Sequence, residues 1–344
     1  MSSESKCAEK NEISKPAKIL YIINSFQGYH YKGGGAQTQL GLILKSMTDN
    51  LPDKFSKTVL VTKAPDVGNR SVTYPDKTTT IIGSSTTYEL VHNFLLAASS
   101  HHILHFATSF FSNPYKLLGA TNIFHNKPSV MLLSSNDEIE KLKKPKTSLI
   151  IRAIKNISVF VSQSEELTDQ ALSVGIPRSK IRLVNNVVDT DYFTPLNNES
   201  RIAKRQKLFP NLGKDKLIYI YSGRVSEKGK NVRELIEEWI KEGLYKDGNK
   251  LILAGPLETI IPSQEGNELF GEYGNDSLCE NNSYGIYWTG FIPQEEIKNL
   301  LQVSDVFVSA STNEGFSNSC LEAASTGLIC IAREGTPGNS KIIV

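Results

Sequence analysis

The sequence predicts an α/β fold built from two doubly wound, Rossmann-like domains. Three observations support this prediction: the strand candidates are continuous apolar runs, helical patterns lie between them, and the series begins again after residue 215. Continuous apolar strands are buried on both faces, as in parallel sheets that helices cover. The length of 344 residues is enough for two domains of ordinary size, each with its own hydrophobic core.

Short apolar runs predict the strands of the first half of the chain. They are Lys18–Asn24, Thr58–Thr62, Thr79–Ile82, Ile103–Ala107, Val130–Leu133, Val159–Ser162 and Ile181–Val184. A helix is predicted over Gln37–Met47, where apolar residues recur at helical spacing. Helices that alternate with such strands indicate doubly wound topology.

The second half repeats this alternation. Its predicted strands are Leu217–Tyr221, Leu251–Ala254, Ile286–Trp288, Val306–Val308 and Leu328–Ala332. Its predicted helices are Val232–Trp239, Glu295–Val303 and Ser319–Thr326, the last of which is closed by Gly327.

A change of composition marks the expected domain boundary. Pro195 is followed by the polar, charged stretch Asn197–Gln206, which we interpret as a linker. We therefore expect a polar tail over residues 1–17, a first domain over 18–200 and a second domain over 201–344. Residues 262–284 are rich in Gly, Asn, Glu and Ser and predict a long surface loop.

Composition excludes several classes of protein. The net charge of +2 gives no basic excess of the kind that nucleic-acid partners select. The polar N-terminus lacks the apolar core of a signal peptide, and no apolar run reaches the roughly 20 residues that span a bilayer. The four cysteines show no C-x-x-C spacing, so a zinc site is not expected. We expect a cytoplasmic protein with free thiols.

The strongest chemical motif is a pair of carboxylates, Glu314 and Glu322, in a Gly-containing loop and the helix that follows it. A strand, a tight loop and a helix start offer free backbone N–H groups to an anion. A carboxylate can accept hydrogen bonds from two vicinal hydroxyls, so this pair suits a ligand with sugar at both ends. The alternative interpretation is a helix cap with a surface glutamate.

A second motif follows the strand at Leu217–Tyr221. Gly223 would let the backbone turn at the strand end, and Arg224 with a following lysine would reach into a cleft. Arg and Lys together can neutralise a diphosphate as charge develops on it. A solvated basic loop is the alternative.

Two weaker motifs lie in the first half. The Gly-rich segment 33–35 lacks the spacing of a dinucleotide fingerprint, and it fits either a phosphate-approaching loop or a plain turn. Asp189 and Asp191 form a D-x-D, which can hold a metal with a diphosphate or can form a turn before the linker.

In this order along the chain, the motifs resemble the retaining GT-B glycosyltransferases of glycosyltransferase family four, the glycosyl transferases group 1. The resemblance runs from about residue 18 to the end. It rests on the Gly-rich loop at 33–35, Val161–Ser164 with Gly175–Pro177, Asn186–Pro195, Gly223-Arg224 with the following KGKN, Leu253–Pro256, Trp288–Pro293, Ser304–Val308 and Glu314–Glu322.

The resemblance implies a donor site in the second domain. Arg224 and a lysine would bind the donor diphosphate, with Lys230 preferred over Lys228 because it fits the register of the following helix. Glu314 would contact the donor sugar and Glu322 the ribose hydroxyls. The other implied donor-binding residues are Gly34, Gly35, Lys228, Gly290, Phe291, Ile292, Gly315, Phe316, Ser317, Asn318 and Ser319. The resemblance implies a UDP- or GDP-sugar as co-substrate, no cofactor and no metal.

The chain departs from the family pattern in three places. The family's first-domain histidine is absent, because Ser134–Asp137 stands at that position. Val187 replaces the usual glycine of an Asn-Gly turn, so that turn must differ, since Val tolerates positive φ poorly. The chain stops at Val344, and we therefore expect the second domain to be incomplete.

The function expected from the resemblance is retaining hexosyl transfer from a nucleotide-diphosphate sugar to a glycan, lipid-linked or small-molecule hydroxyl. A non-catalytic nucleotide-sugar-binding protein, or shortened pseudoenzyme, is one alternative, and a UDP-sugar epimerase is another. Segment 137–155 carries basic side chains beside apolar ones. It is either a solvated face over a core helix or a peripheral contact with an anionic membrane.

Overall fold

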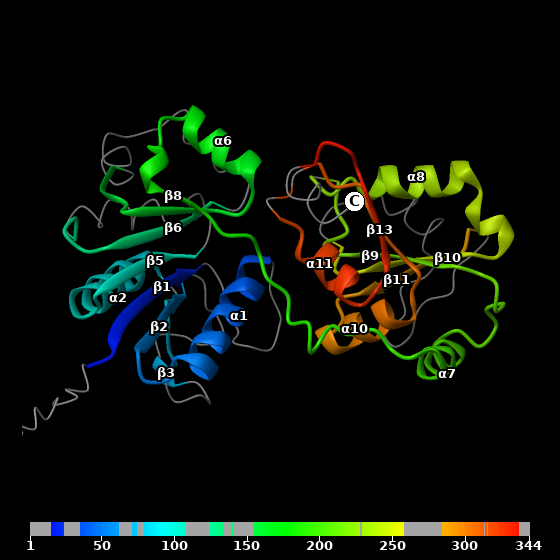
Figure 1. The fold of residues 1–344 in the computed structure, drawn as a ribbon, viewed down its shortest axis with the longest axis horizontal. Helices are drawn as coiled ribbons and strands as arrows, with labels where there is room; N and C mark the ends of the chain where they lie inside the picture. The colour runs from blue at the N-terminus through cyan, green and yellow to red at the C-terminus, as the bar shows by residue number, and fades with distance from the viewer. Residues whose placement is uncertain are drawn as a thin grey trace, which may run out of the picture.

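Two parallel sheets form the centres of two domains in the computed structural model, with the first domain in blue to green and the second in green to red (Figure 1). The structure describes residues 15–23, 35–61, 71–73, 79–84, 86–107, 124–133, 139, 155–227, 229–257, 284–312, 314 and 316–336. The predicted loop at 262–284 lies almost wholly outside these ranges.

The first sheet has eight strands in the order β3-β4-β2-β1-β5-β6-β7-β8. The strands are β1 Ala17–Ile23, β2 Phe55–Val61, β3 Ser71–Thr73, β4 Thr79–Gly83, β5 Ile103–Phe106, β6 Ser129–Leu133, β7 Val159–Ser162 and β8 Ile181–Leu183. All pairings in this sheet are parallel except that of β3 with β4. The sequence did not predict β3, because a three-residue edge strand carries no apolar run.

The second sheet has five parallel strands in the order β11-β10-β9-β12-β13. The strands are β9 Ile218–Ser222, β10 Lys250–Ala254, β11 Ile286–Gly290, β12 Val306–Ser309 and β13 Ile329–Ala332. Every strand predicted from the sequence is present, with its ends shifted by no more than about three residues, as is usual for such boundaries. The prediction of parallel α/β architecture is confirmed.

Helices connect the strands. The first domain has α1 Gly35–Asn50, α2 Thr87–Ser100, α6 Glu165–Ser173 and the short η1 Arg178–Lys180. The second has α7 Asn198–Leu208, α8 Val232–Glu242, the short η2 Leu244–Asp247, α10 Gln294–Val303 and α11 Asn318–Ser325. In Figure 1, α1 lies on the side of the first domain that faces α10 and α11.

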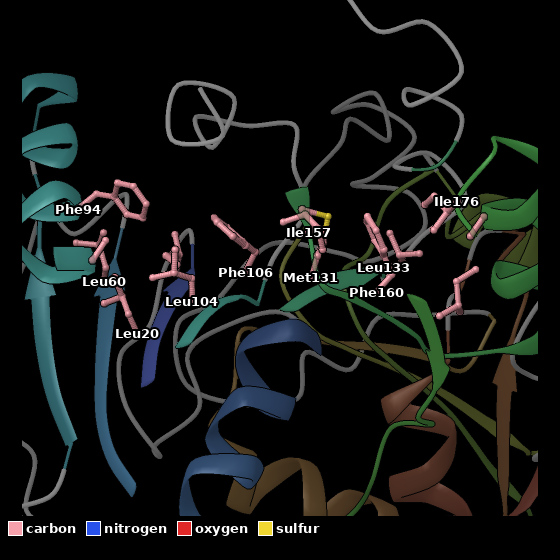
Figure 2. Close-up of a cluster of buried hydrophobic side chains, with 14 of the residues drawn as sticks. Leu20, Leu60, Phe94, Leu104, Phe106, Met131, Leu133, Ile157, Phe160 and Ile176 are labelled. Atoms are coloured by element: carbon pink, nitrogen blue, oxygen red, sulfur yellow. The ribbon is translucent and has the colours of Figure 1, made fainter. Parts of the chain in front are cut away.

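Alternate strand residues build two cores in the second domain. Ile218 and Ile220 pack into one apolar cluster, whereas Tyr221 packs into another on the opposite face of the sheet. Both faces of the second sheet are therefore buried, which explains why the sequence of β9 is a continuous apolar run. The first domain has a comparable cluster over its sheet, which includes Phe94 of α2 and Leu20, Leu60 and Phe106 of the strands (Figure 2).

The interpretation of Asn197–Gln206 as a linker was wrong, because these residues form most of α7. The Asn197 side chain caps the helix by accepting a hydrogen bond from the Ser200 backbone N–H at 2.8 Å. None of the helix residues is buried, so the sequence carries no apolar stripe that would predict it.

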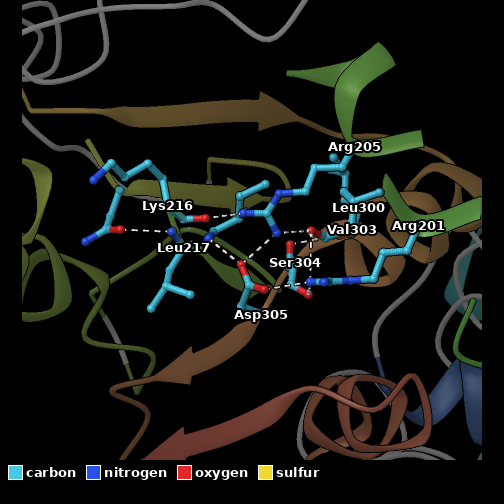
Figure 3. Close-up of polar contacts among 10 residues, drawn as sticks. Arg201, Arg205, Lys216, Leu217, Leu300, Val303, Ser304 and Asp305 are labelled. Atoms are coloured by element: carbon cyan, nitrogen blue, oxygen red, sulfur yellow. Dashed lines mark hydrogen bonds and ion pairs between the residues drawn. The ribbon is translucent and has the colours of Figure 1, made fainter. Parts of the chain in front are cut away.

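Charged side chains fasten α7 to the second domain (Figure 3). Asp305 accepts hydrogen bonds from Arg201 at 2.6 Å, from Arg205 at 2.8 Å and from the Ile218 backbone N–H at 2.8 Å. Burial raises the pKa of Asp305, but these hydrogen bonds outweigh that effect and hold the pKa below its ordinary value. The carboxylate thus joins α7, β9 and the start of β12.

We predict that Asp305→Ala lowers the free energy of unfolding of the second domain by about 2–4 kcal/mol, because two guanidinium groups lose their acceptor in a half-buried site. Urea unfolding followed by circular dichroism measures this change. The exposed pair of Glu238 and Lys241 provides the control, since Glu238→Ala should change stability little. Equal urea midpoints for Asp305→Ala and Glu238→Ala would contradict the role of Asp305.

Candidate functional site

Two glycines bring the loops after β9 and β10 into backbone contact. Gly223 and Gly255 have φ values of 150° and 149°, and a Cβ added at Gly255 would lie 1.8 Å from the Gly223 carbonyl oxygen. The Gly223 N–H donates to the Ala254 carbonyl at 2.9 Å. This close approach requires glycine. It places the exposed Arg224 at the carboxyl edge of the sheet, where ligands of open α/β sheets bind.

An ion pair joins two residues that the sequence assigned to catalysis. The Lys230 ammonium binds the Glu314 carboxylate, and the side chains are only 19% and 16% exposed. The Thr312 N–H donates to the Gly229 carbonyl at 3.1 Å, so the loops after β9 and β12 also meet through their backbones. The structure therefore brings Lys230 to Glu314, whereas Lys228 lies outside the described residues.

The start of α11 forms one wall of this region. Ser317 is the N-cap, and its hydroxyl accepts a hydrogen bond from the Cys320 N–H at 3.3 Å. The Ser317 and Ser319 hydroxyls lie 3.3 Å apart. Gly315 lies outside the described residues, as does Gly34, while Gly35 begins α1.

The two apolar residues of the loop after β11, Phe291 and Ile292, have different surroundings. Gly290 has a φ of 65°, the left-handed conformation that glycine adopts without strain. Phe291 is 53% exposed and lines a cavity, whereas Ile292 packs against the apolar core of the second domain. Phe291 is therefore the side chain that can meet a ligand, and Ile292 supports the loop.

The cavity, of about 600 Å³, lies between the two domains. One wall is a face of α1 on which Thr38, Gly41, Leu42 and Lys45 recur at helical spacing. The other walls come from the segment between β8 and α7 (residues 184–197), here called the linker, and from the second domain: Val187, Val188, Asp189, Tyr192, Phe193, Phe291, Pro293, Gln294, Glu295, Asn318 and Glu322. The mixture of aromatic faces with a few polar groups is typical of small-molecule sites.

Glu322 is a carboxyl group of this cavity whose pKa is shifted toward neutral pH. Burial raises the pKa of Glu322 to about 7, and a hydrogen bond with the Gln294 side chain opposes that rise. A carboxylate that is costly to ionise without a partner gains from hydroxyl donors that satisfy it. The arrangement suits a diol, such as that of a ribose.

A cluster of side-chain amides connects the domains beside this cavity. The Gln39 amide of α1 donates to the Val187 carbonyl at 2.8 Å and to the Asn318 side-chain oxygen at 3.0 Å, and it accepts from the Val187 N–H at 3.0 Å. Asn186 donates to the same Asn318 oxygen at 2.7 Å and to the Phe316 carbonyl at 3.0 Å. Sequence reasoning missed Gln39, because its partners lie 148 and 279 residues away.

The D-x-D segment forms a turn. The Asp189 carboxylate accepts from the Tyr192 N–H at 3.0 Å and pairs with Lys45 at 3.3 Å. The turn interpretation is therefore confirmed for Asp189. Val187 does not have a positive φ, as predicted. Its backbone N–H donates to the Gln39 side chain. Within the described ranges, no three His, Cys, Asp or Glu side chains gather as a metal site.

Two predictions concern membranes. Among the residues that the structure describes, no helix has the length and apolar character to cross a bilayer. The basic segment at 137–155 lies almost wholly outside the described residues, and so do Ser134–Asp137.

Comparison with known proteins matches residues 203–344 to the family of glycosyl transferases group 1. An alpha-galactosylglucosyldiacylglycerol synthase of Streptococcus pneumoniae is 26% identical over 162 residues, which cover 46% of this chain and 38% of the synthase. The UDP-Gal:alpha-D-GlcNAc-diphosphoundecaprenol alpha-1,3-galactosyltransferase of Escherichia coli is 29% identical over 154 residues, or 44% of this chain and 36% of that enzyme. The chain thus matches less than two fifths of the length of these relatives.

Solved structures share the fold over nearly the whole chain. HepE of Anabaena in complex with UDP-glucose has a TM-score of 0.64 at 17% identity, covering 95% of this chain and 83% of HepE. The sucrose-phosphate synthase of Thermosynechococcus elongatus has a TM-score of 0.66 at 15% identity, covering 92% of this chain and 81% of the synthase. The predicted GT-B fold, with two Rossmann-like domains that face each other, is confirmed.

We predict that Glu322→Gln stabilises the protein more at pH 8 than at pH 5. The folded pKa of about 7 exceeds the unfolded value of about 4.3. The stability that Glu322 contributes is therefore fully present below about pH 4.3 and is lost as the pH rises through 7. Glutamine cannot ionise, so the melting temperature of the variant relative to wild type should rise with pH.

The exposed substitution Glu237→Gln serves as the control in the same melting experiments. A Glu322→Gln difference that is equal at pH 5 and pH 8 would show that Glu322 is not the titrating group.

Proposed function

We propose that the protein transfers a sugar from a nucleotide-diphosphate donor to an acceptor hydroxyl with retention of the anomeric configuration, on the premise that residues 203–344 match the glycosyl transferases group 1 in a chain of the GT-B fold. The observation that carries the proposal is the ion pair of Lys230 with Glu314, which joins the loop after β9, where Arg224 also lies, to the loop after β12. One loop region there offers both positive charge for phosphate and a carboxylate for sugar hydroxyls.

Arg224 and Lys230 would stabilise the diphosphate as it leaves. Charge develops on the leaving oxygen when the bond to the anomeric carbon breaks, and fixed cations in a partly dry site lower the energy of that state. The half-buried Glu314 holds the Lys230 ammonium in place. The backbone and hydroxyls at the start of α11 would complete the cradle for sugar and phosphate.

Retention follows if the acceptor hydroxyl attacks the anomeric carbon from the face that the diphosphate leaves. No side chain needs to form a covalent intermediate in this mechanism. The departing phosphate oxygen would accept the proton of the hydroxyl, and positioning of the two substrates would supply much of the rate increase. No metal is needed, because Arg224 and Lys230 provide the positive charge.

The cavity between the domains would hold the nucleoside. Glu322 would accept hydrogen bonds from the ribose hydroxyls, and Phe291 would pack against the base. We propose a UDP- or GDP-sugar as donor, and the UDP-glucose bound to the structurally similar HepE favours UDP.

The acceptor is proposed to be bound by the first domain. Both relatives have names that specify lipid-linked products or substrates, and this favours a lipid-linked acceptor over a free glycan or a small molecule. We accordingly propose a cytoplasmic protein in peripheral contact with a membrane, with the basic segment 137–155 as the contact.

We predict that Arg224→Ala and Glu314→Gln each lower kcat/KM for sugar transfer by about 100-fold or more. The first change removes a cation that stabilises the leaving diphosphate, and the second removes the carboxylate that holds Lys230 and contacts the donor sugar. Glu314→Gln keeps an acceptor for Lys230, and Arg224 is exposed, so circular dichroism and melting temperature should stay close to wild type. Lys241→Ala, on the exposed surface of α8, is the control. Transfer rates for both site variants within threefold of the Lys241→Ala rate would refute these roles.

A further inference from the structure

Gln39 of α1 links the first domain to the second. Its side chain makes three hydrogen bonds, two to the backbone of Val187 in the linker and one to the side chain of Asn318 in the second domain. The residue is only 6% exposed. A buried amide with both ends satisfied by a distant segment fixes the position of that segment.

The directions of these hydrogen bonds require an amide, rather than a carboxylate, at position 39. The Gln39 nitrogen faces two acceptors, the Val187 carbonyl and the Asn318 side-chain oxygen, while its oxygen faces the Val187 N–H. A carboxylate of the same shape could accept from the Val187 N–H but would face the two acceptors without a hydrogen to donate. Glutamate is therefore a same-size substitution that removes two of the three bonds.

Asn318 is the point where this link reaches the proposed donor site. It is the first residue of α11, directly after the capping Ser317, and it lines the interdomain cavity. Its side-chain oxygen accepts from both Gln39 and Asn186, so both lone pairs are used and the amide is oriented. The Asn186 side chain in turn accepts from Gln163, which follows β7 of the first domain.

We propose that Gln39 is a positioning residue for the transfer step. By holding the linker at Val187 and α11 at Asn318, it sets where an acceptor on the first domain lies relative to a sugar held by the second. This inference rests on the proposed function. Transfer requires the reacting atoms in line, and a displacement of about 1 Å can cost on the order of 100-fold in rate.

The first test separates the transfer step from donor binding. Gln39→Glu should lower kcat for sugar transfer at least tenfold, while the Kd for UDP or GDP changes less than threefold, since Arg224, Lys230 and Glu322 lie in the second domain and Gln39 itself does not line the cavity. Asn50→Asp makes the same amide-to-acid change at the exposed end of α1 and should leave both values unchanged. Unchanged kcat, or kcat and Kd that worsen in parallel, would overturn the positioning role.

The second test needs no substrate. In Gln39→Ala the Val187 N–H loses its acceptor, so hydrogen–deuterium exchange of peptides that cover residues 184–190 should become at least tenfold faster than in wild type. An unchanged exchange rate would overturn the link itself. A wild-type protein that transfers no sugar from any nucleotide donor would instead contradict the proposed function, and the exchange result would still decide whether Gln39 holds the linker.

Discussion

Two hydrogen bonds to one oxygen atom, that of the Asn318 side chain, hold together parts of the molecule that are far apart in the sequence. The donors are Gln39 of α1 and Asn186 of the linker, which precede Asn318 by 279 and 132 residues. Because of these bonds, the start of α11 lies against the first domain. Residues of α1 and of α11 both line the interdomain cavity, so these bonds join two of its walls.

The charges of the site are balanced in two ways. Lys230 and Glu314 neutralise each other, so they can stay half-buried at little net cost. For Glu322, burial instead raises the pKa to about 7, and the hydrogen bond with Gln294 opposes this rise only in part. A folded protein that keeps a carboxylate in this state gives up stability near neutral pH, as is common where a ligand later satisfies the group.

The sequence predicted the strands well, because each strand of a covered parallel sheet is a continuous apolar run. It did not predict the ion pair of Lys230 with Glu314, because it assigned the two residues separately to the diphosphate and to the donor sugar. It failed for α7, whose stability comes from Arg201, Arg205 and Asp305 rather than from an apolar face. It failed for Gln39, because a polar residue in a helix gives no sign of a partner in another domain. The expected roles of all the site residues stay predictions, and Gly34, Lys228 and Gly315 lie outside the described residues.

Phosphorus and proton NMR of one reaction mixture test the central claim most directly. The protein is incubated with a UDP- or GDP-sugar and a lipid-linked acceptor, and both the nucleotide and the anomeric proton are followed. The account predicts acceptor-dependent release of the nucleoside diphosphate and a product with the donor's anomeric configuration. A nucleotide sugar that binds but stays intact would indicate a binding protein. Conversion into another nucleotide sugar without release of the diphosphate would indicate an epimerase, and either result would contradict sugar transfer.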